Sequence, residues 1–475
     1  MQHSMPTTTT TTMLTGPPAK SWSLTFDLAI AIVSDLLRRS SSKTVEDLQR
    51  LSTTKGAPVP SDMKRHKVLL PQDYRVRAGN HLGCLFTAQD EQAIGWDWKS
   101  DKKRVKELKG EWMQPKKVSS PLKRTILYLH GGAYYLGSYG LYRNLLARLA
   151  KLSDARVFAI NYRLAPQHPF PAAVEDALAA YLYMLDPPEG IDPVDPNSIV
   201  VAGDSAGGGL SLSLLLALRD AGLPLPGGAM TLSPWVDLTH SLPSIINNIS
   251  TDYLPPTGFK HAPSKAQDYT LLPPLKRTCS IGPFAESDLD RVQFYADNRV
   301  LKHPLVSPVF DKKSLRGLPK LLIQTGTAER LHDEAVYAAL LASDPLFSCN
   351  DKKDDKGDDD RTDVTLEIYV DQPHVFQIIL PTRSSTCAIK RLADFVRDAT
   401  VQEDIETSPD SNTTKGSKLK VHTISPRGNI SETKNELLDT FKDGTKWTDW
   451  QASLAKESLR SRLEDVEAAV AKLDV

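Results

Sequence analysis

The sequence predicts an α/β fold, in which a mostly parallel β-sheet carries helices on both faces. Short apolar runs alternate along the chain with helical stretches. The runs also lack the polar alternation of a half-exposed strand, as a sheet covered on both faces requires. The predicted strands cover residues 126–129, 157–160, 199–202, 321–323 and 366–370, and the predicted helices cover residues 142–152, 172–185, 206–221 and 333–343.

Composition and charge exclude several classes of protein. The chain has 475 residues, of which 40% are hydrophobic, so it can bury the core of at least one large domain. Lys and Arg together number 58, as do Asp and Glu, and this balance argues against a nucleic-acid-binding protein, which needs a basic excess. The 4 cysteines lie far apart without a CxxC pair, which excludes a disulfide scaffold and a cysteine-rich zinc module. We therefore expect a protein of a reducing compartment, the cytoplasm.

The N-terminal region predicts a polar tail followed by one helix. Residues 1–21 are polar and low in complexity, and we expect disorder there. Residues 24–37 present a broad apolar helical face, but the stretch is too short and, with Asp27 and Asp35, too charged to span a bilayer. A helix that packs on its own protein is favoured. The alternative is peripheral contact with a membrane through this helix, which implies an endoplasmic-reticulum or lipid-surface location.

The chain continues well beyond the last predicted strand. Residues 401–433 are polar in composition and are interpreted as a flexible linker. Residues 434–475 are predicted to form a helical tail, because apolar residues recur in it at helical spacing. Residues 351–363 form an acidic island that lacks the fixed offsets of a calcium loop, so we expect a solvated loop and no metal site. The apolar stripe of the tail consists of Leu459, Leu463, Val466, Val470 and Leu473.

A candidate nucleophile follows the third predicted strand. Ser205 lies in the pattern Gly-x-Ser-x-Gly, between an apolar strand and a helix rich in small residues. In this strand–turn–helix arrangement a sharp turn lifts the serine hydroxyl out of the sheet. The flanking Gly203 and Gly207 are needed because a side chain at either place would collide with the neighbouring strand or helix. The context favours a nucleophile over an ordinary serine in a glycine-rich turn.

A serine nucleophile needs a base and an acid that orients the base. His374 follows the last predicted strand, at the same edge of the sheet as Ser205, and the chain order serine, acid, histidine fits a triad. The acid should lie between them, after residues 321–323. Glu329 comes soonest after that strand and is favoured. Asp333 is the alternative, although its position is typical of the first turn of the next helix.

Donors for a developing oxyanion are predicted after the first strand. His130 is followed by Gly131 and Gly132, and glycine lets bare backbone approach a substrate oxygen. We expect the oxyanion hole to consist of the N–H groups of Gly131, Gly132 and Ala206. His130 is expected to brace the loop rather than to transfer protons.

Several ordered motifs of the middle part of the chain resemble the hormone-sensitive lipase family of α/β-hydrolases, and fungal steryl acetyl hydrolases look similar. The motifs are HGGAYYLGS (130–138), NYRLAPQHPFPAAVEDA (161–177), GDSAGGGL (203–210), SPWVDL (233–238), GTAERLHDE (326–334) and QPHVFQ (372–377). The resemblance implies a serine esterase that acts on small to medium acyl esters, including esters of hydrophobic alcohols, without cofactor or metal. It places the triad on Ser205, Glu329 and His374.

The resemblance also implies a domain organisation. The implied parts are an N-terminal helical cap region (22–105), an α/β-hydrolase domain (106–400) and a cap insertion within that domain (241–299). Apart from the resemblance, the aromatic residues Tyr134, Tyr135 and Trp235 lie within these motifs and are expected to line the acyl or alcohol pocket, with a place in the core as the alternative. The partner expected from this reading is a small-molecule ester, and oligomeric state stays open.

Two other functions share this fold. A non-catalytic ligand receptor is one alternative, but receptors of this kind tend to lose the histidine, and here Ser205, Glu329 and His374 are all present. An amidase or deacetylase differs only in the chemistry of its pocket, and fold alone does not choose among substrates. Both alternatives therefore stay open at the level of sequence.

Overall fold

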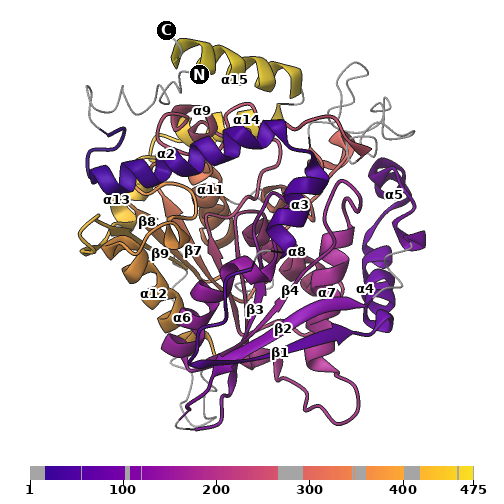
Figure 1. Ribbon diagram of the computed structural model, residues 1–475. Helices are drawn as coiled ribbons and strands as arrows, with labels where there is room; N and C mark the ends of the chain where they lie inside the picture. The colour runs from indigo at the N-terminus through magenta and orange to yellow at the C-terminus, as the bar shows by residue number, and fades with distance from the viewer. Residues whose placement is uncertain are drawn as a thin grey trace, which may run out of the picture.

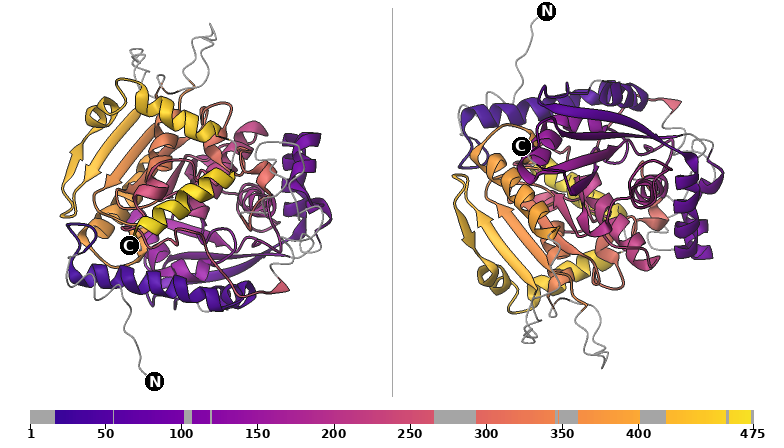
Figure 2. Two further views of the ribbon diagram at one scale, coloured as in Figure 1. Left: turned by 90° about the horizontal axis from the view of Figure 1, so that it is seen from above. Right: turned by 90° about the horizontal axis from the view of Figure 1, so that it is seen from below.

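A computed structural model confirms the predicted α/β fold (Figure 1). A twisted sheet crosses the molecule, and helices cover both of its faces (Figure 2). The structure describes residues 17–54, 56–101, 107–118, 120–265, 293–344, 347, 360–400, 418–456 and 459–473.

The sheet follows the order β1-β2-β4-β3-β5-β6-β7-β8-β9-β10. All pairings from β4 through β9 are parallel, whereas β1, β2 and β10 join antiparallel at the two edges. All strands expected from apolar runs are present. The strands are β1 (Met63–Leu70), β2 (Leu108–Pro115), β3 (Arg124–Leu129), β4 (Ala155–Ile160), β5 (Ile199–Asp204), β6 (Gly228–Leu232), β7 (Lys320–Gly326), β8 (Val364–Tyr369), β9 (Leu419–Ile424) and β10 (Ile430–Glu432).

Helices α6 and α12 cover one face of the sheet, and α7, α8 and α11 cover the other (Figure 2). The predicted helices correspond to α6, α7, α8 and α11 within about two residues at each end. The helices are α2 (Leu24–Arg39), α3 (Val45–Thr54), α4 (Gln72–Leu85), α5 (Ala88–Ile94), α6 (Arg143–Ser153), α7 (Ala172–Leu185), α8 (Ala206–Asp220), α9 (Ser244–Asn247), α11 (His332–Ser343), α12 (Arg383–Ala399), α13 (Lys434–Asp439), α14 (Thr445–Ala455) and α15 (Leu459–Leu473).

Strand β3 shows why the central strands are apolar without alternation. Ile126 and Tyr128 belong to the core on the α6 and α12 side, whereas Leu127 and Leu129 belong to the core on the opposite side. All four side chains are fully buried. Because both faces of the strand lie in a core, apolar side chains are favoured at both positions of the two-residue repeat.

Helix α2 packs on the protein, as favoured from the sequence. Trp22 precedes it, and Phe26 and Ile30 on its inner side pack against Ala328 in the loop after β7. Its outer side remains apolar and exposed along one stripe, formed by Leu24, Leu28, Ile32 and Leu36. Contact of this stripe with a lipid surface stays a prediction. No helix in the described part of the chain is long and apolar enough to cross a membrane.

Two sequence-based interpretations need correction. The predicted linker 401–433 is wrong over its second half, because β9 and β10 extend the sheet there; residues 401–417 lie outside the described residues. The predicted cap region 22–105 is wrong at β1, which is an edge strand of the central sheet. Both edges are half-exposed, so their strands mix polar with apolar residues and carry no continuous apolar run.

Other predicted segments are described only in part. The predicted disordered N-terminus 1–21 lies outside the described residues up to residue 16, and so do residues 266–292 of the predicted cap insertion. Residues 351–359 of the acidic island also lie outside. Within the predicted helical tail 434–475 the structure describes α13, α14 and α15.

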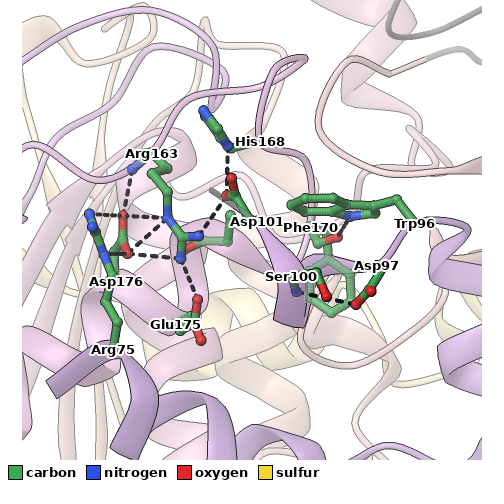
Figure 3. Close-up of polar contacts among 11 residues, drawn as sticks. Arg75, Trp96, Asp97, Ser100, Asp101, Arg163, His168, Phe170, Glu175 and Asp176 are labelled. Carbon is green, nitrogen blue, oxygen red and sulfur yellow. Dashed lines mark hydrogen bonds and ion pairs between the residues drawn. The ribbon is translucent and has the colours of Figure 1, made fainter. Parts of the chain in front are cut away.

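A buried cluster of charges joins the N-terminal region to the central α/β core (Figure 3). Arg75 of α4 binds Asp176 of α7 at 2.6 Å, and Arg163, after β4, also contacts Asp176 at 3.0 Å. The same guanidinium of Arg163 binds Glu175 and reaches Asp101 at 2.9 Å. The side chains of Arg163 and Asp176 are only 4% and 0% exposed. The two arginines therefore compensate carboxylates that water does not reach.

Replacing Arg163 with methionine should lower the free energy of unfolding by about 3–5 kcal/mol, because it leaves buried carboxylates without compensation. Urea denaturation followed by circular dichroism measures this loss. The matched control is Arg50→Met, which removes an exposed ion pair with Asp47 and should leave the urea midpoint unchanged. Equal midpoints for the two variants would contradict the stabilising role of the cluster.

Candidate active site

Ser205 lies in a sharp turn between β5 and α8. Its backbone has φ 52° and ψ −122°, a strained conformation for a residue with a side chain. A Cβ atom on Gly203 would lie 2.2 Å from the carbonyl oxygen of Gly207, and one on Gly207 would lie 2.0 Å from that of Leu129. Only glycine fits at both places, which confirms the predicted strand–turn–helix and the reason for its glycines.

His374 and Glu329 meet at the carboxyl edge of the sheet. His374 lies in the loop after β8 and Glu329 in the loop after β7, and His374 Nδ1 is 3.1 Å from Glu329 Oε2. Their side chains are 3% and 0% exposed. Asp333 lies instead in the first turn of α11, where its carboxylate accepts the N–H of Ser244. The structure thus pairs the histidine with the favoured acid and not with the alternative.

The surroundings of Glu329 keep its carboxylate ionised. Burial alone would raise its pKa, but hydrogen bonds from His374, Thr325 and Ser233 and the charge of His374 lower it below the usual value for glutamate. The backbone N–H of Gly326 donates to the same carboxylate at 2.8 Å. Oε1 of Glu329 therefore accepts from its own loop, while Oε2 faces the imidazole.

The imidazole of His374 lies in a negative environment. Burial alone would lower its pKa, but the hydrogen bond to Glu329 and the charges of Glu329, Asp252 and Asp204 raise the pKa above the usual value for histidine. Asp204, one of these charges, directly precedes Ser205 in the chain.

The raised pKa of His374 predicts an acidic limb in the pH profile. As the expected general base, His374 must be neutral, so kcat/KM should fall as pH decreases through this pKa, with a half-maximal point above the usual value for histidine. Asp252→Asn removes one charge that raises the pKa and should move the limb to lower pH. Asp62→Asn, which removes an exposed carboxylate paired with Lys151, is the control and should leave the limb in place. Rates of ester hydrolysis between pH 4.5 and 9 measure the limb, and an unshifted profile for Asp252→Asn would contradict this assignment.

The glycine loop after β3 requires a correction to the predicted oxyanion hole. The N–H of Gly131 donates to Asp204 Oδ1 at 2.9 Å, so it is not available to a substrate. The N–H groups of Gly132, Ala133 and Ala206 have no acceptor among the described residues. Ala133 also lines the cavity that contains Ser205. The donors available at the site are therefore Gly132, Ala133 and Ala206.

Asp204 and His130 hold this loop in place. The buried carboxylate of Asp204 accepts the hydroxyls of Tyr128 and Tyr142 at 2.8 and 2.9 Å, in addition to the N–H of Gly131. His130 stacks on Tyr162 with ring centroids 4.3 Å apart. Burial lowers the pKa of His130 to about 4, so it stays neutral, in keeping with its predicted bracing role.

The acid loop is fastened by the segment that follows α9. Asn248 Nδ2 donates to the carbonyl oxygens of Thr327 and Glu329 at 3.1 and 2.7 Å. The hydroxyl of Thr251 donates to the carbonyl of Ala328 at 2.9 Å. These bonds satisfy consecutive carbonyl groups around Glu329 and so fix the position of its side chain.

Asp252 connects the acid loop to the histidine loop. Its carboxylate accepts the backbone N–H of Arg330 at 2.7 Å and faces the N–H of His374 at 3.4 Å. It is buried and close enough to influence the imidazole electrostatically. Asp252 and Asn248 were not identified from the sequence, since no motif or spacing relates them to the candidate triad; Ser233 begins the motif SPWVDL, but no role was predicted for it.

An apolar cavity of about 390 Å³ opens beside Ser205. Tyr135 and Trp235 line it, as predicted. Tyr134 does not: it is fully buried and stacks on Tyr295, with ring centroids 3.6 Å apart, so it belongs to the core. Within the described ranges, no group of three or more His, Cys, Asp and Glu side chains is placed to hold a metal ion.

Comparison with known proteins gives consistent likenesses. A family model described as the α/β-hydrolase fold matches residues 126–268. An acetyl-hydrolase from Streptomyces hygroscopicus is 40% identical over 239 residues, which span 50% of this chain and 67% of that protein. An esterase from Acinetobacter venetianus is 30% identical over 224 residues, or 46% of this chain and 61% of that protein.

A solved structure extends the likeness to most of the fold. The crystal structure of an esterase from the bacterial hormone-sensitive lipase family matches with a TM-score of 0.55 and 28% identity, covering 80% of this chain and all of that one. The likeness in sequence to the relatives and the likeness in fold to the solved structure lead to one assignment. The chain belongs to the hormone-sensitive lipase-like family of carboxylic-ester hydrolases with the α/β-hydrolase fold.

Proposed function

We propose that this enzyme cleaves esters with a Ser205–His374–Glu329 triad through an acyl-enzyme intermediate. The observation that carries the proposal is the buried contact of 3.1 Å between His374 Nδ1 and Glu329 Oε2, at the sheet edge where Ser205 lines an apolar cavity. This contact fixes the imidazole so that Nε2 is the nitrogen left to accept a proton.

Acylation begins when the Ser205 hydroxyl attacks the ester carbonyl carbon and its proton passes to His374 Nε2. The carbonyl oxygen becomes an oxyanion that accepts hydrogen bonds from the N–H groups of Gly132, Ala133 and Ala206. When the intermediate collapses, the bond to the alcohol oxygen breaks and His374 returns its proton to the leaving alcohol. The acyl group then remains on Ser205.

Deacylation repeats these steps with water as the nucleophile. His374 removes a proton from water as its oxygen attacks the acyl carbon, and the same donors hold the second oxyanion. The Ser205 oxygen leaves and regains the proton from His374, which releases the carboxylic acid. Glu329 stays ionised throughout and stabilises the imidazolium formed in each half-reaction.

The cavity favours small to medium acyl esters with apolar groups. Its volume of about 390 Å³ accommodates a chain of several carbons, and its wall includes Leu238, Ile245 and Leu254. The relative from Streptomyces is named an acetyl-hydrolase, which favours acetate as the smallest member of the acyl range. An apolar wall also suits a hydrophobic alcohol.

Covalent labelling with a fluorophosphonate probe tests the proposal. The probe should inactivate hydrolysis of p-nitrophenyl acetate and leave one adduct, which mass spectrometry of the digested protein locates on Ser205. Ser213→Ala is the matched control. Ser213 is a buried serine of α8, the helix that follows Ser205, and its hydroxyl donates to the carbonyl of Gly209. It should label like the unmodified chain.

An adduct on another residue, or continued hydrolysis by a labelled enzyme, would contradict the assignment of Ser205. Turnover of p-nitroacetanilide at the rate of p-nitrophenyl acetate would identify an amidase instead. A chain that neither reacts with the probe nor turns over any ester would point to the receptor alternative.

A further inference from the structure

The C-terminal helix α15 contributes to the cavity that contains Ser205. It crosses the top of the molecule over the carboxyl edge of the sheet (Figure 1), and the view from above shows it across the centre (Figure 2). Leu459, Leu463 and Val466 line the cavity from this helix, together with Arg462 and Glu467. The end of the chain thus reaches the candidate active site.

The buried residues of helix α15 lie in its first turn. Leu459 and Arg462 are its buried residues. The guanidinium of Arg462 donates to the carbonyl oxygens of Thr239, Ser453 and Lys456 at 2.9, 2.7 and 2.6 Å. These bonds tie the first turns of the helix to the loop after β6 and to the end of α14.

The later turns of α15 are only partly buried. A second cavity, of about 470 Å³, is lined by residues from these turns and by residues from α9 and the segment after it. Leu463 remains 43% exposed although it faces the first cavity. Leu463 therefore offers apolar surface at the border of the cavity, and a bound apolar chain that reached it would cover this surface.

The apolar side chains of α15 share one face of the helix. Leu459, Leu463 and Val466 are spaced by four and three residues, so they line up on the side that faces the cavity. Tyr135 and Leu254 line the cavity from other segments of the chain. Ser205 belongs to the same lining, so an ester held at Ser205 would extend its apolar part between these surfaces.

We propose that α15 forms the outer wall of the substrate cavity and that Leu463 and Val466 bind the apolar chain of the ester. This inference rests on the proposed function, because it requires the ester to react at Ser205. The apolar chain can belong to the acyl group or to the alcohol, since both are hydrocarbon and the wall recognises only hydrocarbon.

The test uses the full chain with the double substitution Leu463→Ala/Val466→Ala. Two substrate series are compared, p-nitrophenyl esters from acetate to decanoate and alkyl acetates from ethyl to octyl. We expect kcat/KM for the shortest member of each series to stay within about twofold, whereas the longer members of at least one series lose about tenfold or more, mainly through a higher KM. The series that responds identifies the chain that contacts α15.

Leu473→Ala is the matched control, because Leu473 is an exposed leucine of the same helix that does not line this cavity. It should leave both series unchanged. Acetate turnover in each variant reports that the protein is folded and active, so a failure of the triad assignment appears separately, as turnover that survives Ser205→Ala. If neither series changes its length dependence in the double variant, the proposed wall is overturned.

Discussion

Replacing Ser205 with alanine should lower kcat for p-nitrophenyl acetate by at least about four orders of magnitude while the protein stays folded. The hydroxyl is the atom that forms the acyl bond, and no other group at this turn replaces it. Alanine preserves the Cβ atom and makes the same demands on the backbone at φ 52°. Stopped assays over hours measure the residual rate, and circular dichroism checks the fold.

The control for this prediction is Ser213→Ala, which removes a buried hydroxyl from α8, the helix that follows Ser205. Its kcat should stay within about threefold of the unmodified chain, since Ser213 donates to a helix carbonyl and not to the cavity. A Ser205→Ala variant that keeps more than about 1% of the activity would show that another group is the nucleophile.

Replacing Glu329 with glutamine should lower kcat by about 10⁴-fold, because the orienting group loses its charge. Glutamine has nearly the same shape, but its amide cannot stabilise the imidazolium and can present a donor to Nδ1. The acceptor for the N–H of Gly326 also changes from a charged to a neutral oxygen. The measurement is kcat for p-nitrophenyl acetate at the pH optimum.

Asp333→Asn separates the two candidate acids. Asp333 accepts the N–H of Ser244 at 2.8 Å, and asparagine can still accept this bond. We expect kcat to change by less than about fivefold in this variant. A larger loss for Asp333→Asn than for Glu329→Gln would exchange the roles of the two residues.

The core of the fold could be predicted because burial and tight turns restrict residues that are close together in the sequence. Strands β3, β4, β5, β7 and β8 are buried on both faces. Such burial requires short continuous apolar runs, which can be recognised in the sequence. The turn at Ser205 needs glycine within two residues on either side, so its signature is equally local. His374 and Glu329 were found because each follows such a strand.

The remaining parts depend on contacts between distant residues. Asp204 occupies the N–H of Gly131 across a separation of 73 residues, and nothing near the glycine pair reveals this bond. Its consequence, that the N–H of Gly131 is bonded to Asp204 and not available at the site, was therefore missed. Strand β9 alternates buried with exposed residues in a polar context, so composition alone suggested a linker.

The central claim is that Ser205, His374 and Glu329 act as one unit, and a kinetic cycle tests this most directly. The measurement compares kcat of Ser205→Ala, His374→Ala and the double variant carrying both substitutions. Each single variant should lose nearly all triad catalysis, and the double variant should be no slower than Ser205→Ala within about threefold. A double variant slowed by the product of the two single effects would contradict the claim, because the serine and the histidine would then contribute independently.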